Sequence, residues 1–423
     1  MVKKLISFSL HNRWLVLLFG IALLLWGVYS VEKNPVDAIP DLSENQVIVF
    51  TEWEGRSPQI IEDQITYPLV SNLQSIPKIK NVRGSSMFGM SFVYVVFDDN
   101  VDIYWARTRV LEKLNYAQRL LPENVTPALG PDGTGVGHIY WYTLDAPNYN
   151  LGELRALQDW YIKYGLQTVK GVAEIASFGG FQKQYQINID PHKLNYYNVT
   201  MMDVLKAVKS NNNDVGGRKF EMSGMGYIVR GLGYIENIKD IESIPVGKDG
   251  STSITIQDVA TVQMGGDLRL GIFDENGEGE VVGGIVVMRY GENADAVIQD
   301  VKSKIVDIEK GLPVGVKIKT AYDRSTLIAA AIKSVKGTLY EEILVVCLIV
   351  IIFLFHWRSA FIIIIQIPIS IAAAFILLNT FGISSNIMSI TGIALAIGVI
   401  VDDGIVMVEN SYRHLAEFQN KKA

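Results

Sequence analysis

Two adjacent acids interrupt an otherwise apolar stretch, Gly392-Ile393-Ala394-Leu395-Ala396-Ile397-Gly398-Val399-Ile400-Val401-Asp402-Asp403-Gly404-Ile405-Val406-Met407-Val408-Glu409-Asn410. A carboxylate at the centre of a membrane helix costs about 2.5–3.5 kcal/mol on insertion scales, so such acids are kept where they have a function. In a low-dielectric site a carboxyl group has a raised pKa and can exchange protons near neutral pH. Asp402 and Asp403 are therefore candidate proton-relay residues. The alternative places both acids at the membrane interface, but the apolar run 405–408 beyond them argues against it.

Small residues recur within the same stretch at a spacing of four. Gly392 pairs in this way with Ala396, and Ala394 pairs with Gly398. Small residues on one helix face let a second helix approach closely. These four residues are the predicted helix-packing positions.

Apolar residues are concentrated in two parts of the chain. No charged residue occurs from Trp14 to Val31, and Arg358 carries the only formal charge between Ile343 and Val401. A bilayer core about 30 Å thick needs about 20 mostly apolar helical residues. With breaks near 356–358 and 381–386, the pattern predicts four transmembrane helices at about 14–31, 341–356, 360–380 and 387–409. Buried helices of a large soluble protein are the alternative for the last three.

The first apolar span resembles a signal peptide in its basic start, Lys3 and Lys4. It is too long for one, and Trp26, Tyr29 and Glu32 stand where a cleavage site needs small residues. An uncleaved membrane anchor is therefore expected. Basic residues flank the first span, the 356–358 break and the fourth span, which places both termini in the cytoplasm and residues 32–340 outside.

Residues 32–340 alternate between strand and helix patterns. A strand at 46–53, a helix from Ser57 to about Leu73, strands at 81–86 and 90–97 and a helix at 101–120 give a ferredoxin-like β-α-β-β-α order. A second such unit begins at 138–144, and 281–321 supplies its closing elements. The Gly- and Asn-rich region 182–270 between them has the pattern of an insertion of short strands.

Composition excludes several classes of protein. The 423 residues are 49% hydrophobic and 19% charged, unlike a disordered chain. The single cysteine, Cys347, cannot form an internal disulfide or a cysteine metal cage, and the net charge of −6 gives no basic field for nucleic acid. No catalytic triad order, nucleotide loop or metal-ligand spacing occurs in the sequence. We therefore expect neither an enzyme nor a cofactor.

Several dispersed motifs resemble the heavy-metal-efflux branch of the resistance–nodulation–cell division (RND) permeases. The stretch 392–410 is similar to the fourth transmembrane helix of that family. The remaining motifs follow in the same order as in the family: Ile39-Pro40-Asp41-Leu42-Ser43, Gly55-Arg56-Ser57-Pro58, Glu62-Asp63-Gln64, Tyr67-Pro68-Leu69, Phe88-Gly89-Met90-Ser91, Asn276-Gly277-Glu278-Gly279-Glu280 and Tyr322-Asp323-Arg324-Ser325.

The resemblance implies an inner-membrane, proton-driven exporter of heavy-metal cations that confers metal resistance. Such a permease is a homotrimer and joins a periplasmic adaptor (membrane fusion protein) and an outer-membrane channel. Asp402 matches the relay aspartate of the family, Asp403 a second aspartate seen in multidrug members, and Glu409 the acid of the closing Glu-Asn.

The resemblance also divides the chain into six parts. These are the cytoplasmic start with the first transmembrane helix (1–31), the first porter subdomain (32–134), the second porter subdomain in two pieces (135–181 and 271–335), a docking-type insertion (182–270), and transmembrane helices two to four with the cytoplasmic end (336–423).

Copper and silver exporters are the most similar in the last span. They export soft cations that favour thioether ligands, and Met388 stands where their pattern has a methionine, which makes it a candidate metal ligand. Ile400 and Leu268 replace two other methionines of that pattern. Ala396 stands where the zinc, cobalt and cadmium branch has an acid. Copper or silver is the first expectation, and zinc, cobalt or cadmium is the alternative.

RND permeases are internal duplications with six transmembrane helices in each half. The resemblance thus implies a truncated, N-terminal portion, without the lysine partner of the relay aspartate and the three-methionine site of the second half. We expect this portion to be transport-incompetent alone. Two other hypotheses are a fragment acting as an assembly or interaction subunit, and an RND permease for organic compounds.

Overall fold

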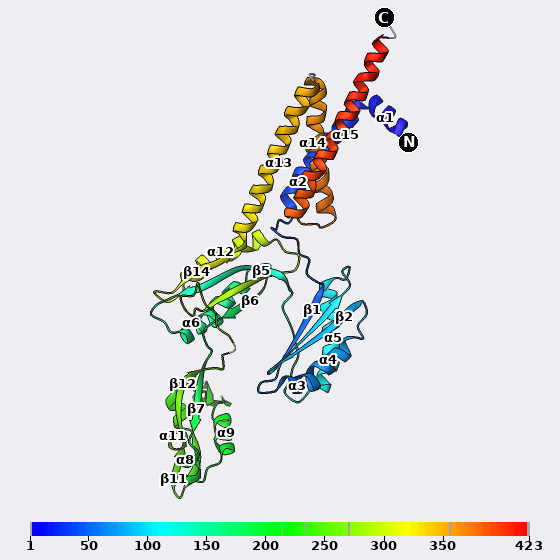
Figure 1. The fold of residues 1–423 in the computed structure, drawn as a ribbon. Helices are drawn as coiled ribbons and strands as arrows, with labels where there is room; N and C mark the ends of the chain where they lie inside the picture. Colours follow the sequence, from blue (N-terminus) through cyan, green and yellow to red (C-terminus); the bar gives the residue numbers. More distant parts are fainter. Residues whose placement is uncertain (1, 214, 232, 270, 355–356, 421–423) are drawn as a thin grey trace.

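The computed structural model describes residues 2–420 except 214, 232, 270, 355 and 356. Long helices run side by side at one end of the molecule, and α/β units lie beneath them (Figure 1). A third unit extends from the second and forms the far end of the molecule.

The first α/β unit follows the strand and helix order expected from the sequence. Its four strands form one antiparallel sheet in the order β2-β3-β1-β4. Its elements are β1 (Gln46–Glu52), α3 (Pro58–Ile61), η1 (Glu62–Thr66), α4 (Tyr67–Leu73), β2 (Ile79–Met87), β3 (Met90–Phe97), α5 (Ile103–Ala117), η2 (Gln118–Leu120) and β4 (Ala128–Leu129).

Local sequence signals explain where the helices of this unit begin. Ser57 is extended at the N-cap of α3 with Pro58 in the first turn, and the Asp102 side chain accepts a hydrogen bond from Trp105 N at the start of α5. The helices cover one face of the sheet, where Ile65, Leu69 and Val93 are fully buried.

The second unit is assembled from two parts of the chain that lie on either side of 182–270. Its sheet order is β14-β5-β13-β6, and Ile285 of β13 lies between Trp141 and Ala176. Its elements are β5 (Gly133–Asp145), α6 (Leu151–Leu157), η3 (Gln158–Ile162), α7 (Lys163–Gln167), β6 (Val172–Phe178), β13 (Gly283–Arg289), α12 (Ala294–Glu309) and β14 (Lys317–Asp323).

The two units share a feature that the sequence analysis missed. The first helix of each contains one π-helical turn, η1 in the first and η3 in the second. Each turn carries a buried polar side chain that bonds to the sheet: Thr66 Oγ1 lies 2.8 Å from Ser91 Oγ, and Tyr142 OH donates to Gln158 Oε1 at 3.0 Å. Single π turns inside α-helices are rare, and a pattern of 3.6-residue periodicity does not predict them.

The inserted unit starts and ends on one antiparallel pair. Strand β7 (Lys183–Ile189) pairs with β12 (Ala260–Gly266) over its full length. The sequence predicted only short strands between them, but helices are present as well. The strands are β8 (Val215–Met222), β9 (Met225–Gly231), β10 (Pro245–Asp249) and β11 (Thr252–Thr255). The helices are α8 (Pro191–Tyr196), α9 (Met201–Ser210), α10 (Ile238–Glu242) and α11 (Ile256–Val259). Side-chain caps start these helices: Thr200 begins α9 and Asn237 begins α10.

The helix bundle follows the apolar stretches, with one difference. Its helices are α2 (Arg13–Lys33), α13 (Arg324–Leu354), α14 (Trp357–Thr380) and α15 (Ile387–Asn420), and α1 (Val2–His11) precedes them. The second span was expected to begin near 341, but α13 begins at Arg324 beside the second α/β unit. The expected boundary between 335 and 336 therefore lies inside one continuous helix. The expected break at 356–358 includes His356, which lies outside the described residues.

Two helices in the described part of the chain are long and apolar enough to cross a membrane, Arg13–Lys33 and Ile387–Ser411. A shorter apolar segment, Ile364–Thr380, belongs to α14. The arrangement of four spans is therefore not confirmed and stays a prediction. Helix α1 and the end of α15 lie at the same end of the bundle (Figure 1).

Candidate functional site

Helix α15 has one buried face and one exposed face. Ile397 and Val401 are buried against Ile367 of α14, and Ile393 and Ile405 extend this contact. These positions recur every three or four residues, as expected for one side of a helix. The buried face holds α15 against its neighbours and turns the opposite side outward.

The candidate proton-relay acids lie on the exposed side. We call six residues on it the acidic face of α15: Met388, Leu395, Val399, Asp402, Val406 and Glu409. Their spacing of three, four or seven places them within a narrow arc of the helix. The four apolar members are between 54% and 78% exposed, and both acids are exposed.

The three predicted relay residues are not equivalent in position. Asp402 and Glu409 lie on the same arc about 10 Å apart along the axis, because seven residues make two turns. Asp403 is also exposed, but it points about 100° away from Asp402 around the helix. None of the three carboxylates forms an ion pair with another residue that the structure describes. The acidic face thus carries unpaired acids among exposed apolar side chains.

The predicted packing glycines make no close helix contact within the described part of this chain. No atom lies within 4 Å of a Cβ built at Gly392 or Gly398, and Ala396 is exposed. The close approach occurs instead between α2 and α14. There a Cβ at Gly27 would lie 2.7 Å from Ala372 Cα and closer still to Ala372 Cβ. The sequence contained the small residues of this contact, but not which helices would meet.

Met388 lies in the first turn of α15, far from the relay acids. It is 14 residues from Asp402, about 21 Å along the helix axis, so the two cannot form one site. Its neighbour Asn386 caps the helix: Asn386 Oδ1 accepts a hydrogen bond from Ser389 N at 3.0 Å. The described residues contain no group of three or more His, Cys, Asp or Glu side chains that could hold a metal ion.

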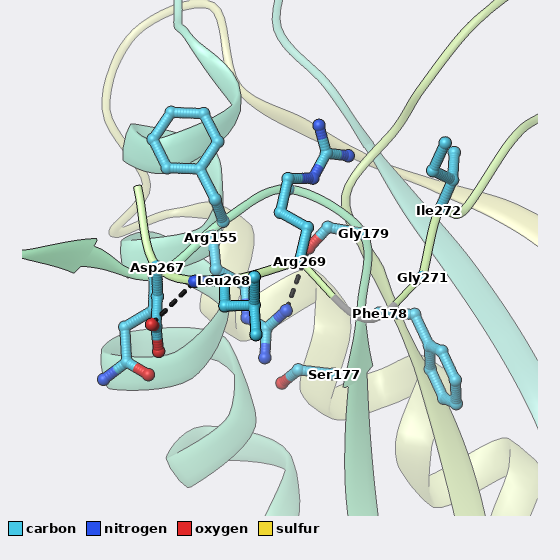
Figure 2. A pocket seen from close by; sticks show the side chains of 12 residues that line it. Arg155, Ser177, Phe178, Gly179, Asp267, Leu268, Arg269, Gly271 and Ile272 are labelled. Carbon is cyan, nitrogen blue, oxygen red and sulfur yellow. Dashed lines mark hydrogen bonds between the residues drawn. The ribbon is translucent and has the colours of Figure 1, made fainter. Parts of the chain in front are cut away.

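A cavity of about 480 Å³ lies where the chain enters and leaves the inserted unit. Residues 177–182, 267–269, 271 and 272 line it together with Arg155 (Figure 2). Arg155 forms an ion pair with Asp159 at 2.7 Å and donates to Gly179 O at 2.9 Å, while Arg269 forms an ion pair with Glu280. Both guanidinium charges are therefore balanced by carboxylates.

Leu268, which replaces a methionine of the copper and silver pattern, belongs to this cavity. Its side chain is labelled in Figure 2 and is 75% exposed. The described lining residues include no Met, Cys or His. A soft cation would find no soft ligand in the cavity as it stands.

The second unit also contains a charged pair next to the start of α13. Lys302 Nζ lies 2.5 Å from Asp323 Oδ2, and Ser325 donates to Asp323 Oδ1 from both its N–H and its hydroxyl. Burial alone would raise the pKa of Asp323, but the hydrogen bonds from Lys302 and Ser325 outweigh it and hold that pKa below its usual value.

This pair predicts a pH dependence of stability. Because the folded-state pKa of Asp323 is lowered, its contribution is present above pH 4 or so and is lost as the pH falls through that pKa. Asp323→Asn should lower the free energy of unfolding by about 1–2 kcal/mol at pH 7. Unfolding measured in detergent from pH 3 to 8 should show this deficit shrinking below pH 4. Asp307→Asn, which breaks the exposed pair with Lys310, is the control and should change little. An Asp323→Asn deficit that stays constant down to pH 3 would contradict the prediction.

Comparison with known proteins gives the family. The sequence profile of the AcrB/AcrD/AcrF family matches residues 5–423. The chain belongs to this family. Individual relatives confirm the resemblance to heavy-metal efflux permeases. The chain is 46% identical over 424 residues to the cation efflux system protein CusA of Escherichia coli (strain K12), covering 100% of this chain and 40% of that protein.

Two further relatives agree with the family assignment. The cobalt-zinc-cadmium resistance protein CzcA of Cupriavidus metallidurans is 40% identical over 430 residues, covering 99% of this chain and 40% of that protein. A crystal structure of a heavy metal efflux pump superposes with a TM-score of 0.86 at 33% identity, over 97% of this chain and 41% of that chain. The RND permease fold is thereby confirmed. This AcrB/AcrD/AcrF family member spans about two fifths of the length of these relatives.

Proposed function

We propose that the chain is part of a proton-driven RND permease that exports heavy-metal cations from the cell. The observation that carries this proposal is the acidic face of α15, where Asp402 and Glu409 lie unpaired among exposed apolar side chains. Similarity over the whole chain to a cation efflux protein supports it. We further propose that the chain is a secondary transporter and not an enzyme.

The acidic face suggests how proton movement is used. An exposed apolar stripe on a membrane helix is suited to contact another helix, and an acid within it would then lie away from water. In that setting Asp402 alternates between a neutral protonated form and a charged form that attracts a cationic side chain. Binding and release of the proton would shift α15 between two positions. The family resemblance implies that this cationic partner would be a lysine of the second half of the permease.

Copper(I) or silver(I) is the proposed cargo. The higher identity to CusA than to CzcA supports a soft cation, as does Met388 at a methionine position of the copper and silver pattern. Leu268 and Ile400 lack the thioethers of that pattern, so Met388 would be one contact on the path and not a complete site. Zinc, cobalt or cadmium is the alternative cargo.

The placement in the membrane is part of the same proposal. Helices α2, α13, α14 and α15 would span the inner membrane, with the two chain ends in the cytoplasm and the α/β units in the periplasm. The parts 32–134, 135–181 and 271–335 would be porter subdomains, and 182–270 would face an outer-membrane channel. A homotrimer with a periplasmic adaptor would complete the pump.

Transport and resistance measurements together test the proposal. Deleting the gene should lower tolerance to copper or silver, and everted membrane vesicles carrying the full pump should take up that metal when a proton gradient is imposed. Loss of drug tolerance alone would support a permease for organic compounds. Metal tolerance that depends on the chain without any proton-driven metal uptake would support an assembly subunit. Either result would refute the proposal.

A further inference from the structure

Three chain segments that are distant in sequence converge between the helix bundle and the second α/β unit. They are 34–38, which follows α2; 384–386, which precedes α15; and 323–325, where β14 passes into α13. We call these segments the junction. In Figure 1 the junction lies where the lower end of the helix bundle meets the sheet that contains β5 and β14.

Arg324 is the central side chain of the junction. It is only 4% exposed, although it carries a permanent charge. Its Nη2 lies 2.9 Å from Asp37 Oδ1, and its Nη1 donates to the carbonyl oxygen of Val136 in β5. The ion pair with Asp37 balances the charge of the buried Arg324, although Nη2 forms no hydrogen bond within the described part of the chain. Arg324 therefore ties segment 34–38 to the sheet of the second unit.

Segment 34–38 is tied equally closely to the loop before α15. Asp37 N donates to Ser385 O at 3.1 Å, Ser385 N donates to Pro35 O at 2.8 Å, and Asn34 Nδ2 donates to Ser385 Oγ at 2.7 Å. On its other side Ala38, 1% exposed, is part of the core of the second unit. The loop before α15 and the second unit thus both contact the segment 34–38.

This loop is continuous with the helix that carries the relay acids. Asn386 is 5% exposed and caps α15, and Asp402 follows 16 residues later, about 24 Å along the same helix. A helix held by its backbone hydrogen bonds moves as a rigid element over that length. A displacement of α15 at Asp402 would therefore reach Ser385, then Asp37 and Arg324, and then Val136.

We infer that Arg324 is a positioning residue that couples movement of α15 to the central strand β5 of the second unit. It acts through Asp37 and touches neither metal nor proton. The inference rests on the proposed function for its consequence in transport, but the contacts themselves do not depend on it. The neighbouring charged groups, Lys302 and Asp323, pair with each other, so they leave Asp37 as the counter-ion of Arg324.

The first experiment measures transport by the full pump in everted vesicles. Arg324→Gln should lower metal uptake about tenfold while metal binding and assembly stay unchanged. Arg324→Lys should restore part of the rate, because it keeps the charge but not the two-pronged geometry. Arg83→Gln, which breaks the exposed pair with Glu44 in the first unit, is the matched control and should transport normally. Wild-type transport by Arg324→Gln would overturn the inference.

The second experiment measures the coupling by hydrogen exchange and does not require transport. In otherwise wild-type pump, Asp402→Asn should change hydrogen exchange both at residues 387–390 of α15 and at 138–144 of β5. With Arg324→Gln added, the change at α15 should remain and the change at β5 should disappear. Asp37→Asn serves in its place if Arg324→Gln does not fold. An unchanged β5 response in the double variant, or no β5 response to Asp402→Asn alone, would refute the coupling. A pump that moves no metal but shows this exchange pattern would refute the proposed function and leave the coupling standing.

Discussion

Asp402→Asn should abolish proton-driven metal uptake and lower its rate at least about a hundredfold, because asparagine keeps the size of the side chain but cannot bind and release a proton. Asp402 lies in the middle of the acidic face, flanked by Val399 and Val406 one turn away on each side. The measurement is metal uptake into vesicles that carry the full pump under an imposed proton gradient. Metal binding without a gradient should be unchanged.

Asp403→Asn is the matched control, because it makes the same chemical change one residue further along. Asp403 lies about 100° from Asp402 and about 120° from Glu409 around the helix, so its substitution should reduce transport far less. Glu409→Gln, on the same arc as Asp402, should have an intermediate effect. Equal losses in the two aspartate variants would show that position on the helix face does not matter and would contradict the prediction. Transport by Asp402→Asn would refute the relay role.

Gly27→Leu should be the most damaging single substitution in the bundle. A Cβ at this position would lie 2.7 Å from Ala372 Cα, so a side chain has no room unless α2 and α14 separate. Overpacking that forces backbone shifts destabilises proteins by typically about 1–3 kcal/mol and occasionally by more. The expected result is a large loss of folded protein in membranes and a much lower unfolding temperature in detergent.

Gly20→Leu provides the control on the same helix two turns earlier. The nearest atom to a Cβ at Gly20 is Ile369 Cδ1 at 3.8 Å, which is ordinary van der Waals contact. Both substitutions improve helix propensity by about the same amount, so a difference between them measures packing alone. Equal stability of the two variants would contradict the close approach of α2 and α14.

The elements themselves could largely be predicted because their signals are local. The alternation of β1, the Ser57-Pro58 helix start and the apolar stretches each lie within a few neighbouring residues. The strands expected to close the second unit do pair with its opening strands across an insertion of about 90 residues, and the continuous apolar run 285–288 of β13 is buried in the middle of that sheet.

Features that depend on distant contacts were missed. The π turns η1 and η3 each carry a polar side chain bonded to the sheet, and Arg324, the first residue of α13, bonds to β5. The helices α8 to α11 were missed for a different reason. Each is only four to ten residues long and lies in a Gly- and Asn-rich region.

The sequence alone predicts apolar stretches suited to a membrane, two repeated α/β patterns and a pair of acids in the last long helix. Hydropathy and residue spacing are properties of neighbouring residues, so they can be read from the sequence without a structure. The folded structure is needed to show that Asp402 faces outward from the bundle, that Gly27 and not Gly392 meets another helix, and that Arg324 joins Asp37 to β5. Each of these depends on which surfaces bury each other, and burial is set by residues that are far apart along the chain.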